Sequence, residues 1–299
     1  MSFTPEQQAE RRKGLGASEV PIALGLSRFQ AAQELADVKR GILPPFEGNR
    51  FTRCGTLLEA AIAQGWLEDH AAEGVEIFTP PKIPHPSSKI LFASPDRVVV
   101  PAGRYERADW IRLLECKNTS AWNVGSFGES GQEGAALPET FVVQAQTQME
   151  VAGLDACTVV VLIGGNDPRE YPLTRDREMG GDLVQFAEKW WGDHVVQGLP
   201  CPVDGTGAYS EYLRKRYPAA VAPPIPATPE LRELVASLRA AKAATKVAKE
   251  AEDLIGNQLR AAIGEADGVD GLCTYRLQAG STYTVTREPS RVLRLAKEK

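Results

Sequence analysis

The segments LFASPDRVVV, residues 91–100, and WIRLLECK, residues 110–117, decide the fold that this sequence predicts. Both are rich in β-branched and other apolar residues, which is typical of strands. The stretch Pro101-Ala-Gly-Arg between them has the composition of a turn, so the two strands are expected to form a hairpin. Such a hairpin brings Asp96 of the first strand close to Glu115 of the second.

The two acids and a neighbouring lysine point to metal chemistry. Lys117 follows Glu115 by two residues and therefore lies on the same face of its strand. A hard divalent ion such as Mg²⁺ prefers oxygen ligands, which Asp96, Glu115 and the backbone carbonyl of Cys116 could supply. Lys117 could then orient an attacking water or offset charge on a reacting phosphate. A simple cross-strand salt bridge is the alternative.

Two further polar side chains fall on apolar helix faces. Glu59 ends the segment GTLLE in a helix predicted over 55–69, and Gln144 shares a face with Gln148 in a helix predicted over 138–152. Buried polar groups need partners, so a common site for all five residues would satisfy them, and hydrogen bonding within the core is the alternative. The five residues of this expected site are Glu59, Asp96, Glu115, Lys117 and Gln144.

The remaining periodicity indicates an α/β (α+β) fold with a mixed sheet. Strands are predicted over 75–78, 158–163 and 170–173, and helices over 18–24, 29–39 and 179–196. A chain of 299 residues exceeds the roughly 150 residues of a typical domain, so one full domain with an appendage is expected.

The C-terminal third differs in composition from the rest. We expect a domain over 1–204, a Pro-rich linker over 205–229 and a long helix with a broken heptad stripe over 230–265. That stripe would pack either on the core or on a partner. The tail, 266–299, alternates around Ala-Gly-Ser at 279–281, with Tyr275, Leu277, Tyr283 and Val285, and predicts a β-hairpin.

Composition excludes several classes of protein. The five cysteines include no C-x-x-C pair, so neither a disulfide framework nor a zinc knuckle is indicated. No apolar run approaches about 18 residues, so we expect no membrane segment and a cytoplasmic protein, in the host cytoplasm if phage-encoded. A net charge of −5 argues against a basic coat for nucleic acid. The basic run Arg11, Arg12 and Lys13 could still hold a phosphate, or could simply be solvated.

Five motifs in order, Arg11…Ser18, GTLLE, SPD, ECK and QAQTQM, resemble those of the YqaJ-type viral recombinases. This is the lambda-exonuclease-like family of the PD-(D/E)xK nuclease superfamily. The resemblance implies a restriction-endonuclease-like core with a four-stranded mixed sheet and two-metal hydrolysis with Mg²⁺, or Mn²⁺. It assigns metal binding to Asp96 and Glu115, catalysis to Lys117, metal assistance to Glu59 and a supporting role to Gln144.

The resemblance also implies a pocket for a 5′-phosphate, formed by Ser18, Ser94 and either Arg11 or Arg12. The expected activity is 5′→3′ exonuclease action on double-stranded DNA ends, working with a single-strand-annealing protein and as a ring-shaped trimer. An endonuclease with the same site and a catalytically dead DNA-end-binding scaffold remain open. A nuclease with an iron–sulfur cluster is excluded, because only Cys201 and Cys273 follow the core.

Overall fold

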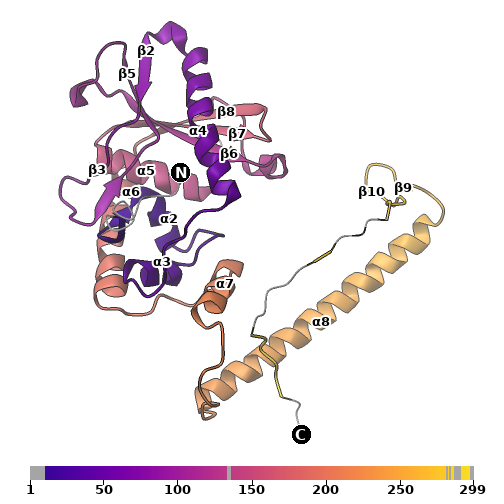
Figure 1. Cartoon of the computed structure of the whole chain (residues 1–299). Coiled ribbons are helices and arrows are strands. Elements are labelled where there is room, and N and C mark those ends of the chain that lie inside the picture. The colour runs from indigo at the N-terminus through magenta and orange to yellow at the C-terminus, as the bar shows by residue number, and fades with distance from the viewer. Residues whose placement is uncertain (1–10, 133–135, 281, 283, 286–290, 297–299) are drawn as a thin grey trace. The chain divides into compact units, whose positions relative to one another are not determined.

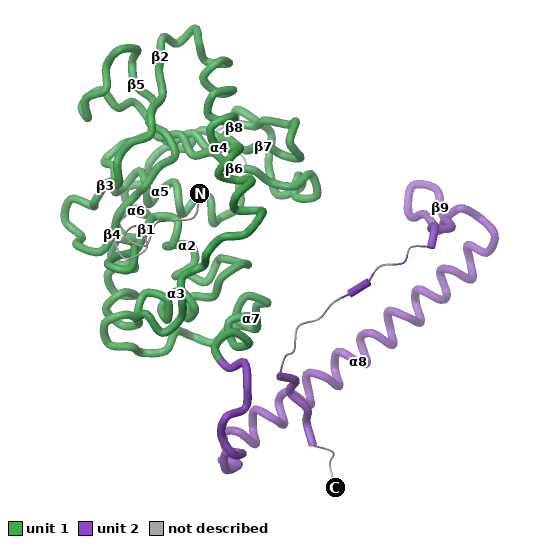
Figure 2. Tube along the Cα trace, viewed as in Figure 1, with its two compact units in different colours: residues 1–216 green, residues 217–299 purple. Residues whose placement is uncertain are grey.

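The structure is a computed structural model that describes residues 11–132, 136–280, 282, 284–285 and 291–296. Two compact units divide the chain, residues 1–216 and residues 217–299 (Figure 2). The first unit carries the two larger sheets and most of the helices (Figure 1).

A five-stranded mixed sheet forms the centre of the first unit, in the order β2-β5-β6-β7-β8. Its strands are β2 (Val75–Phe78), β5 (Arg97–Pro101), β6 (Arg112–Thr119), β7 (Ala156–Ile163) and β8 (Asp167–Thr174). Only β6 and β7 pair in parallel, and the other neighbours are antiparallel. The mixed sheet agrees with the predicted fold class, with one strand more than the four that the resemblance implies.

Helices cover both faces of this sheet. Helix α4 (Arg50–Asp69) packs Ile62 and Trp66 against Val99 and Leu114 on one face. Asn49 caps this helix by accepting hydrogen bonds from the backbone of its first turn, so it begins at Arg50 rather than at residue 55.

Helix α5 (Glu139–Ala152) covers the other face and ends at Gly153, whose φ of 64° is the left-handed conformation that glycine favours. Its Val143 and Met149 join the large core cluster with strand residues such as Leu113. Successive residues of each central strand therefore face α4 and α5 in turn, as strand alternation requires.

The strand predicted over 91–100 is divided, which corrects the sequence-based expectation. Residues Leu91–Ala93 form β4, which pairs in parallel with β1 (Leu15–Gly16) and antiparallel with β3 (Ile83–Pro84) in a separate small sheet. The break follows from Pro95, which has no amide hydrogen to continue a ladder. β5 therefore begins in the main sheet directly after Asp96.

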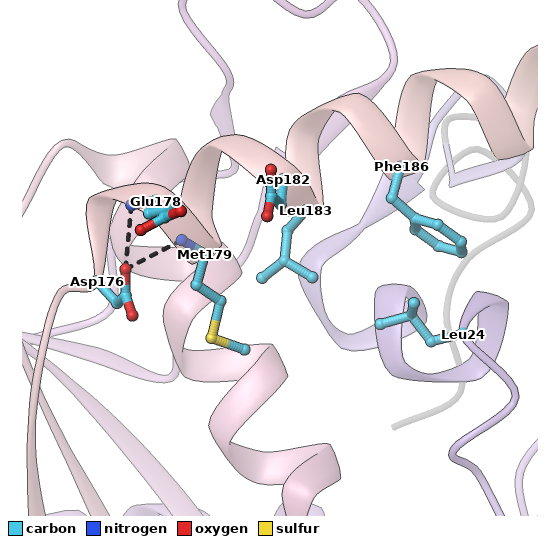
Figure 3. Close-up of a pocket in the computed structure, with 7 residues that line it drawn as sticks. All are labelled: Leu24, Asp176, Glu178, Met179, Asp182, Leu183 and Phe186. Carbon is cyan, nitrogen blue, oxygen red and sulfur yellow. Dashed lines mark hydrogen bonds between the residues drawn. The ribbon is translucent and has the colours of Figure 1, made fainter.

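Short helices surround the small sheet and α5. They comprise α2 (Val20–Ala23), α3 (Ala32–Lys39) and α6 (Arg177–Trp190), and α6 continues into a π-helical turn over Trp191–Val196. Asp176 caps α6 by accepting hydrogen bonds from the backbone nitrogens of Glu178 and Met179 (Figure 3). The shallow pocket beside this cap contains none of the predicted site residues.

The region predicted as a linker over 205–229 contains a helix in its first half. Helix α7 (Gly207–Arg216) buries Tyr209 and Tyr212 against Ala31 and belongs to the first unit. The linker prediction is therefore wrong for these residues. It was based on the Pro content of the whole region, whereas the two tyrosines give residues 207–216 an apolar face that packs on the first unit. Pro-rich chain follows only after this helix.

The second unit contains the long helix α8 (Pro229–Ile263), close to the range predicted, with Thr228 as its N-cap. A small hairpin follows it, formed by the two-residue strands β9 (Gly268–Val269) and β10 (Cys273–Thr274). The hairpin predicted around residues 279–281 is wrong at Tyr275, Leu277 and Val285, which are not in strands, and Tyr283 lies outside the described residues. Among the described helices, none has the length and apolarity needed to cross a membrane.

Candidate active site

The β5–β6 hairpin places Asp96 beside the middle of β6. Arg97 pairs with Leu114 in the antiparallel register, so Asp96 lies next to Glu115 across the ladder. The Asp96 carboxylate accepts a hydrogen bond of 2.8 Å from the backbone nitrogen of Cys116. The predicted proximity of the two acids is thus present in the fold.

Glu115 is buried and its carboxylate is held by three side chains. Lys117 Nζ donates to Oε1 at 2.7 Å, Gln144 Nε2 donates to the same oxygen, and Gln148 Nε2 donates to Oε2 at 2.9 Å. Lys117 also donates to Gln144 Oε1 at 3.0 Å, which closes a ring of polar contacts. A buried carboxylate is stable only when it is paired and hydrogen-bonded, and this network supplies both.

Gln148 is a site residue that the sequence analysis did not assign. Its side chain is 2% exposed, and its Oε1 has no hydrogen-bond partner. The signal was present, because Gln148 lies one helical turn after Gln144 on the same face of α5. The structure adds the contact of each amide with a different oxygen of Glu115.

The acids shift the titration of this cluster. Burial, then the nearby charge of Glu115, raises the pKa of Asp96 from 3.8 to about 8. Burial lowers the pKa of Lys117, but the carboxylates of Glu115 and Asp96 outweigh it and the net shift is upward. The lysine is therefore charged at neutral pH, and Asp96 keeps its proton there until a cation binds beside it.

Glu59 takes a different partner from the one predicted. Its Oε1 lies 3.0 Å from Arg97 Nη1, and Arg97 also donates to the backbone carbonyl of Asp96. Glu59 still contributes to raising the pKa of Asp96, so it lies near the cluster. In the described part of the chain, no three His, Cys, Asp or Glu residues form a group suited to a metal ion.

Two acids and one backbone carbonyl nevertheless fit a hard divalent cation. Asp96, Glu115 and the carbonyl of Cys116 offer oxygen ligands, and a cation bound beside Asp96 would favour the ionised form that burial and Glu115 disfavour. Mg²⁺ usually binds through one or two carboxylates, with water completing its shell. These residues could therefore hold the ion, while Glu59 is engaged by Arg97.

The two predicted phosphate-pocket serines lie at the ends of neighbouring strands. Gly16 of β1 pairs in parallel with Phe92 of β4, and each serine follows its paired residue by two positions. Both Ser18 and Ser94 are exposed. Ser18 lines a pocket of about 560 Å³ that also contains Gln144, whereas Ser94 is not among the residues lining it.

The two candidate arginines differ in their surroundings. Arg11 lies 3.4 Å from Glu19 Oε1, and its side chain is 29% exposed, whereas Arg12 is exposed to solvent. The buried Lys39 donates to both the carbonyl of Arg11 and the carboxylate of Glu19, each at 2.7 Å. This ties the chain around Arg11 to the turn that carries Ser18.

Comparison with known proteins identifies the family of this region. Residues 7–155 match the model of the YqaJ-like viral recombinase domain. The uncharacterized protein YqaJ of Bacillus subtilis (strain 168) is 34% identical over 217 residues, which are 70% of this chain and 61% of that protein. The chain thus spans about three fifths of the length of this relative.

Solved structures support the fold. An alkaline exonuclease (LHK-Exo) from Laribacter hongkongensis matches with a TM-score of 0.50 and 19% identity, over 71% of this chain and 97% of that one. LHK-Exo in complex with dAMP matches with the same values. Through residues 7–155, the chain therefore belongs to the family of YqaJ-like viral recombinase domains.

Proposed function

We propose that the protein is a divalent-metal-dependent deoxyribonuclease that degrades double-stranded DNA from its 5′ ends. The observation that carries this proposal is the convergence of Asp96, Glu115 and Lys117 on one face of the sheet, with Gln144 joining them to a surface pocket. Residues of this kind are what phosphodiester hydrolysis requires.

Each side chain has a defined part in this proposal. Asp96 and Glu115 would hold the ion, which would act as a Lewis acid on the phosphate and lower the pKa of a bound water. Lys117 keeps its positive charge and is placed to offset negative charge that develops on the phosphate oxygens. Gln144 and Gln148 fix the orientation of the Glu115 carboxylate.

Exposed aromatic side chains near the site support a DNA strand as the substrate. A groove of about 980 Å³ runs from Thr119 at the end of β6 past three phenylalanines that are at least 62% exposed. These are Phe29, Phe46 and Phe51. Arg28 and Arg50 lie over the rings of Phe29 and Phe51 at 4.7 and 4.8 Å. Exposed rings and cations of this kind bind unpaired bases and phosphates.

The pocket beside Gln144 supports a choice of strand end. Ser18, Thr119 and Asn123 line it, and all three offer hydrogen-bond donors. A 5′-phosphate bound there would place the first phosphodiester toward Lys117. We further propose that the exposed 3′ strand is passed to a single-strand-annealing protein and that the nuclease acts as an oligomer.

The decisive experiment compares linear and circular duplex DNA, with Mg²⁺ and with EDTA. An exonuclease degrades only the linear molecule and only with Mg²⁺, and its products accumulate from the 5′-labelled end. Nicking of the closed circle would replace this proposal by an endonuclease. Binding of linear ends without degradation at any divalent ion would replace it by a DNA-end-binding scaffold.

A further inference from the structure

Arg97 is a cation at the edge of the acidic cluster, between Glu59 and the backbone of Asp96. Its guanidinium contacts Glu59 Oε1 at 3.0 Å and donates to the backbone carbonyl of Asp96. The side chain is only 15% exposed, against 31% for Glu59. Removing either partner of such a pair is costly, because it leaves a partly buried charge without its counter-charge.

Strand alternation explains why Arg97 meets Glu59. Val99 packs in the cluster of α4, whereas Val98 and Val100 pack on the side of α5. Arg97 shares the parity of Val99 and so projects toward α4, which carries Glu59. Glu115 shares the parity of Leu113 and projects toward α5. The Arg97 and Glu59 pair therefore lies on the opposite side of the sheet edge from the Glu115 carboxylate.

The charges of the cluster nearly balance without a second metal ion. Three carboxylates, Glu59, Asp96 and Glu115, face two cations, Arg97 and Lys117. With all five groups ionised the net charge is −1, and one divalent ion at Asp96 and Glu115 brings it to +1. A second divalent ion at Glu59 would have to displace the guanidinium or lie beside it, and like charges at such distances repel strongly.

We propose that Arg97 takes the place of a second cation at Glu59, so that the free protein binds one divalent ion and not two. The ion is held by Asp96, Glu115 and the carbonyl of Cys116. Lys117 then provides positive charge beside the phosphate, while Arg97 balances the charge of Glu59. This inference rests on the proposed nuclease function and departs from the two ions that the family resemblance implies.

The test counts metal ions bound to the full-length protein in the absence of DNA. Titration calorimetry with Mn²⁺, checked by electron paramagnetic resonance of free Mn²⁺, gives the number per chain. We expect one ion for the parent and for Arg97→Lys, which keeps the charge. Arg97→Ala should bind two, the second at least roughly tenfold tighter than any second ion on the parent. Arg177→Ala, which breaks an exposed ion pair with Asp155, is the matched control and should bind one.

A second substitution locates the additional ion. Glu59→Gln in the parent should leave the count at one, because Glu59 does not bind the first ion. In the Arg97→Ala background, Glu59→Gln should return the count from two to one. Circular dichroism of each variant verifies that the fold is retained, and a variant that unfolds is replaced by Arg97→Gln.

The outcomes separate this inference from the proposed function. Two ions of similar affinity on the parent would overturn the role of Arg97 while leaving a metal-dependent nuclease intact. One ion on both the parent and Arg97→Ala would also overturn it. Absence of any ion on the parent and on every variant would remove the metal-dependent function itself, and this inference with it.

Discussion

The chemistry proposed for this protein depends on a single ammonium group held by two neighbours. Lys117 contacts Glu115 and Gln144, and burial lowers its pKa less than the carboxylates of Glu115 and Asp96 raise it, so it stays charged. Lys117→Ala should lower the rate of cleavage by about 100-fold or more, because it removes charge that stabilises the transition state. DNA binding should change little, whereas the thermal midpoint should fall because the buried Glu115 loses its cationic partner.

A gel assay of linear duplex digestion measures the effect of Lys117→Ala. Lys189→Ala is its control, since that lysine is exposed and pairs with Asp193 on the surface. Digestion by Lys117→Ala at a rate within about threefold of the parent would show that the lysine has no catalytic part.

The titration of Asp96 makes a second prediction at the same scale. Its pKa is about 8 in the fold and 3.8 in the unfolded chain, so between these values the native state keeps a proton that the unfolded state has lost. The contribution of Asp96 to the free energy of unfolding is therefore greatest below about pH 4 and falls as pH rises toward about 8. The loss is on the order of a few kcal/mol.

Urea unfolding at several pH values in EDTA measures this slope. Asp96→Asn cannot titrate and should have a flatter profile than the parent over the same range. Saturating Mg²⁺ should also flatten the profile of the parent, because an ion bound to the carboxylate replaces the proton. Identical slopes for parent and Asp96→Asn in EDTA would show that this carboxyl does not control the pH dependence.

Pairing of β1 with β4 brings Ser18 and Ser94, the two serines predicted to bind the 5′-phosphate, to the same end of neighbouring strands. A Cβ on Gly14, just before β1, would lie 2.3 Å from the backbone oxygen of Ile90, just before β4. Gly14→Ala must therefore push the strands apart. We expect a loss of roughly 1–3 kcal/mol in stability and a smaller preference for 5′-phosphorylated over 5′-hydroxyl ends.

Gly181→Ala is the matched control for Gly14→Ala. Gly181 lies within α6, and no atom outside its own helix lies close to where its Cβ would be. That substitution should stabilise the protein by about 0.5–1 kcal/mol and leave the preference for phosphorylated ends unchanged. An equal loss of preference in both variants would mean that the strand pairing does not shape the pocket.

Local signals in the sequence predicted the elements that carry the site. The hairpin placed Asp96 against Glu115, and helical spacing placed Gln144 and Gln148 on one face. The division of the strand at Pro95 was not predicted, although it could have been, since proline lacks an amide hydrogen. The pair of Glu59 with Arg97 was not readable, because it depends on how α4 lies across the sheet.

The same reasoning explains the errors in the C-terminal part. Helix α7 is stabilised by contacts of Tyr209 and Tyr212 with Ala31, which is distant in sequence, and local composition does not reveal them. The tail hairpin was predicted from an alternating pattern, but the observed turn uses Gly271, whose φ of 68° suits a tight reversal. Tertiary packing and turn chemistry decided these regions more strongly than periodicity.

At the scale of the whole molecule, all of the proposed chemistry belongs to the first unit. The acids, Lys117 and both glutamines lie between residues 59 and 148, and the core clusters close around them before Arg216. Helix α8 has no buried residue within its own unit. A long helix without buried residues adds little stability of its own, so we expect the two units to unfold separately.

Removal of residues 217–299 tests this division. A chain that ends at Arg216 keeps both core clusters and the α7 contacts with Ala31, so its thermal midpoint should lie within a few degrees of that of the parent. It should bind Mn²⁺ with the parent stoichiometry and digest short linear duplexes at a rate within roughly threefold of the parent.

The same two chains show which unit carries the oligomer contacts. Light scattering measures the oligomeric state of each chain, and digestion of long duplexes measures whether that state affects activity. Loss of oligomers together with loss of activity on long DNA only would place the oligomer contacts in the second unit. Loss of Mn²⁺ binding by a folded shortened chain would contradict the independence of the site.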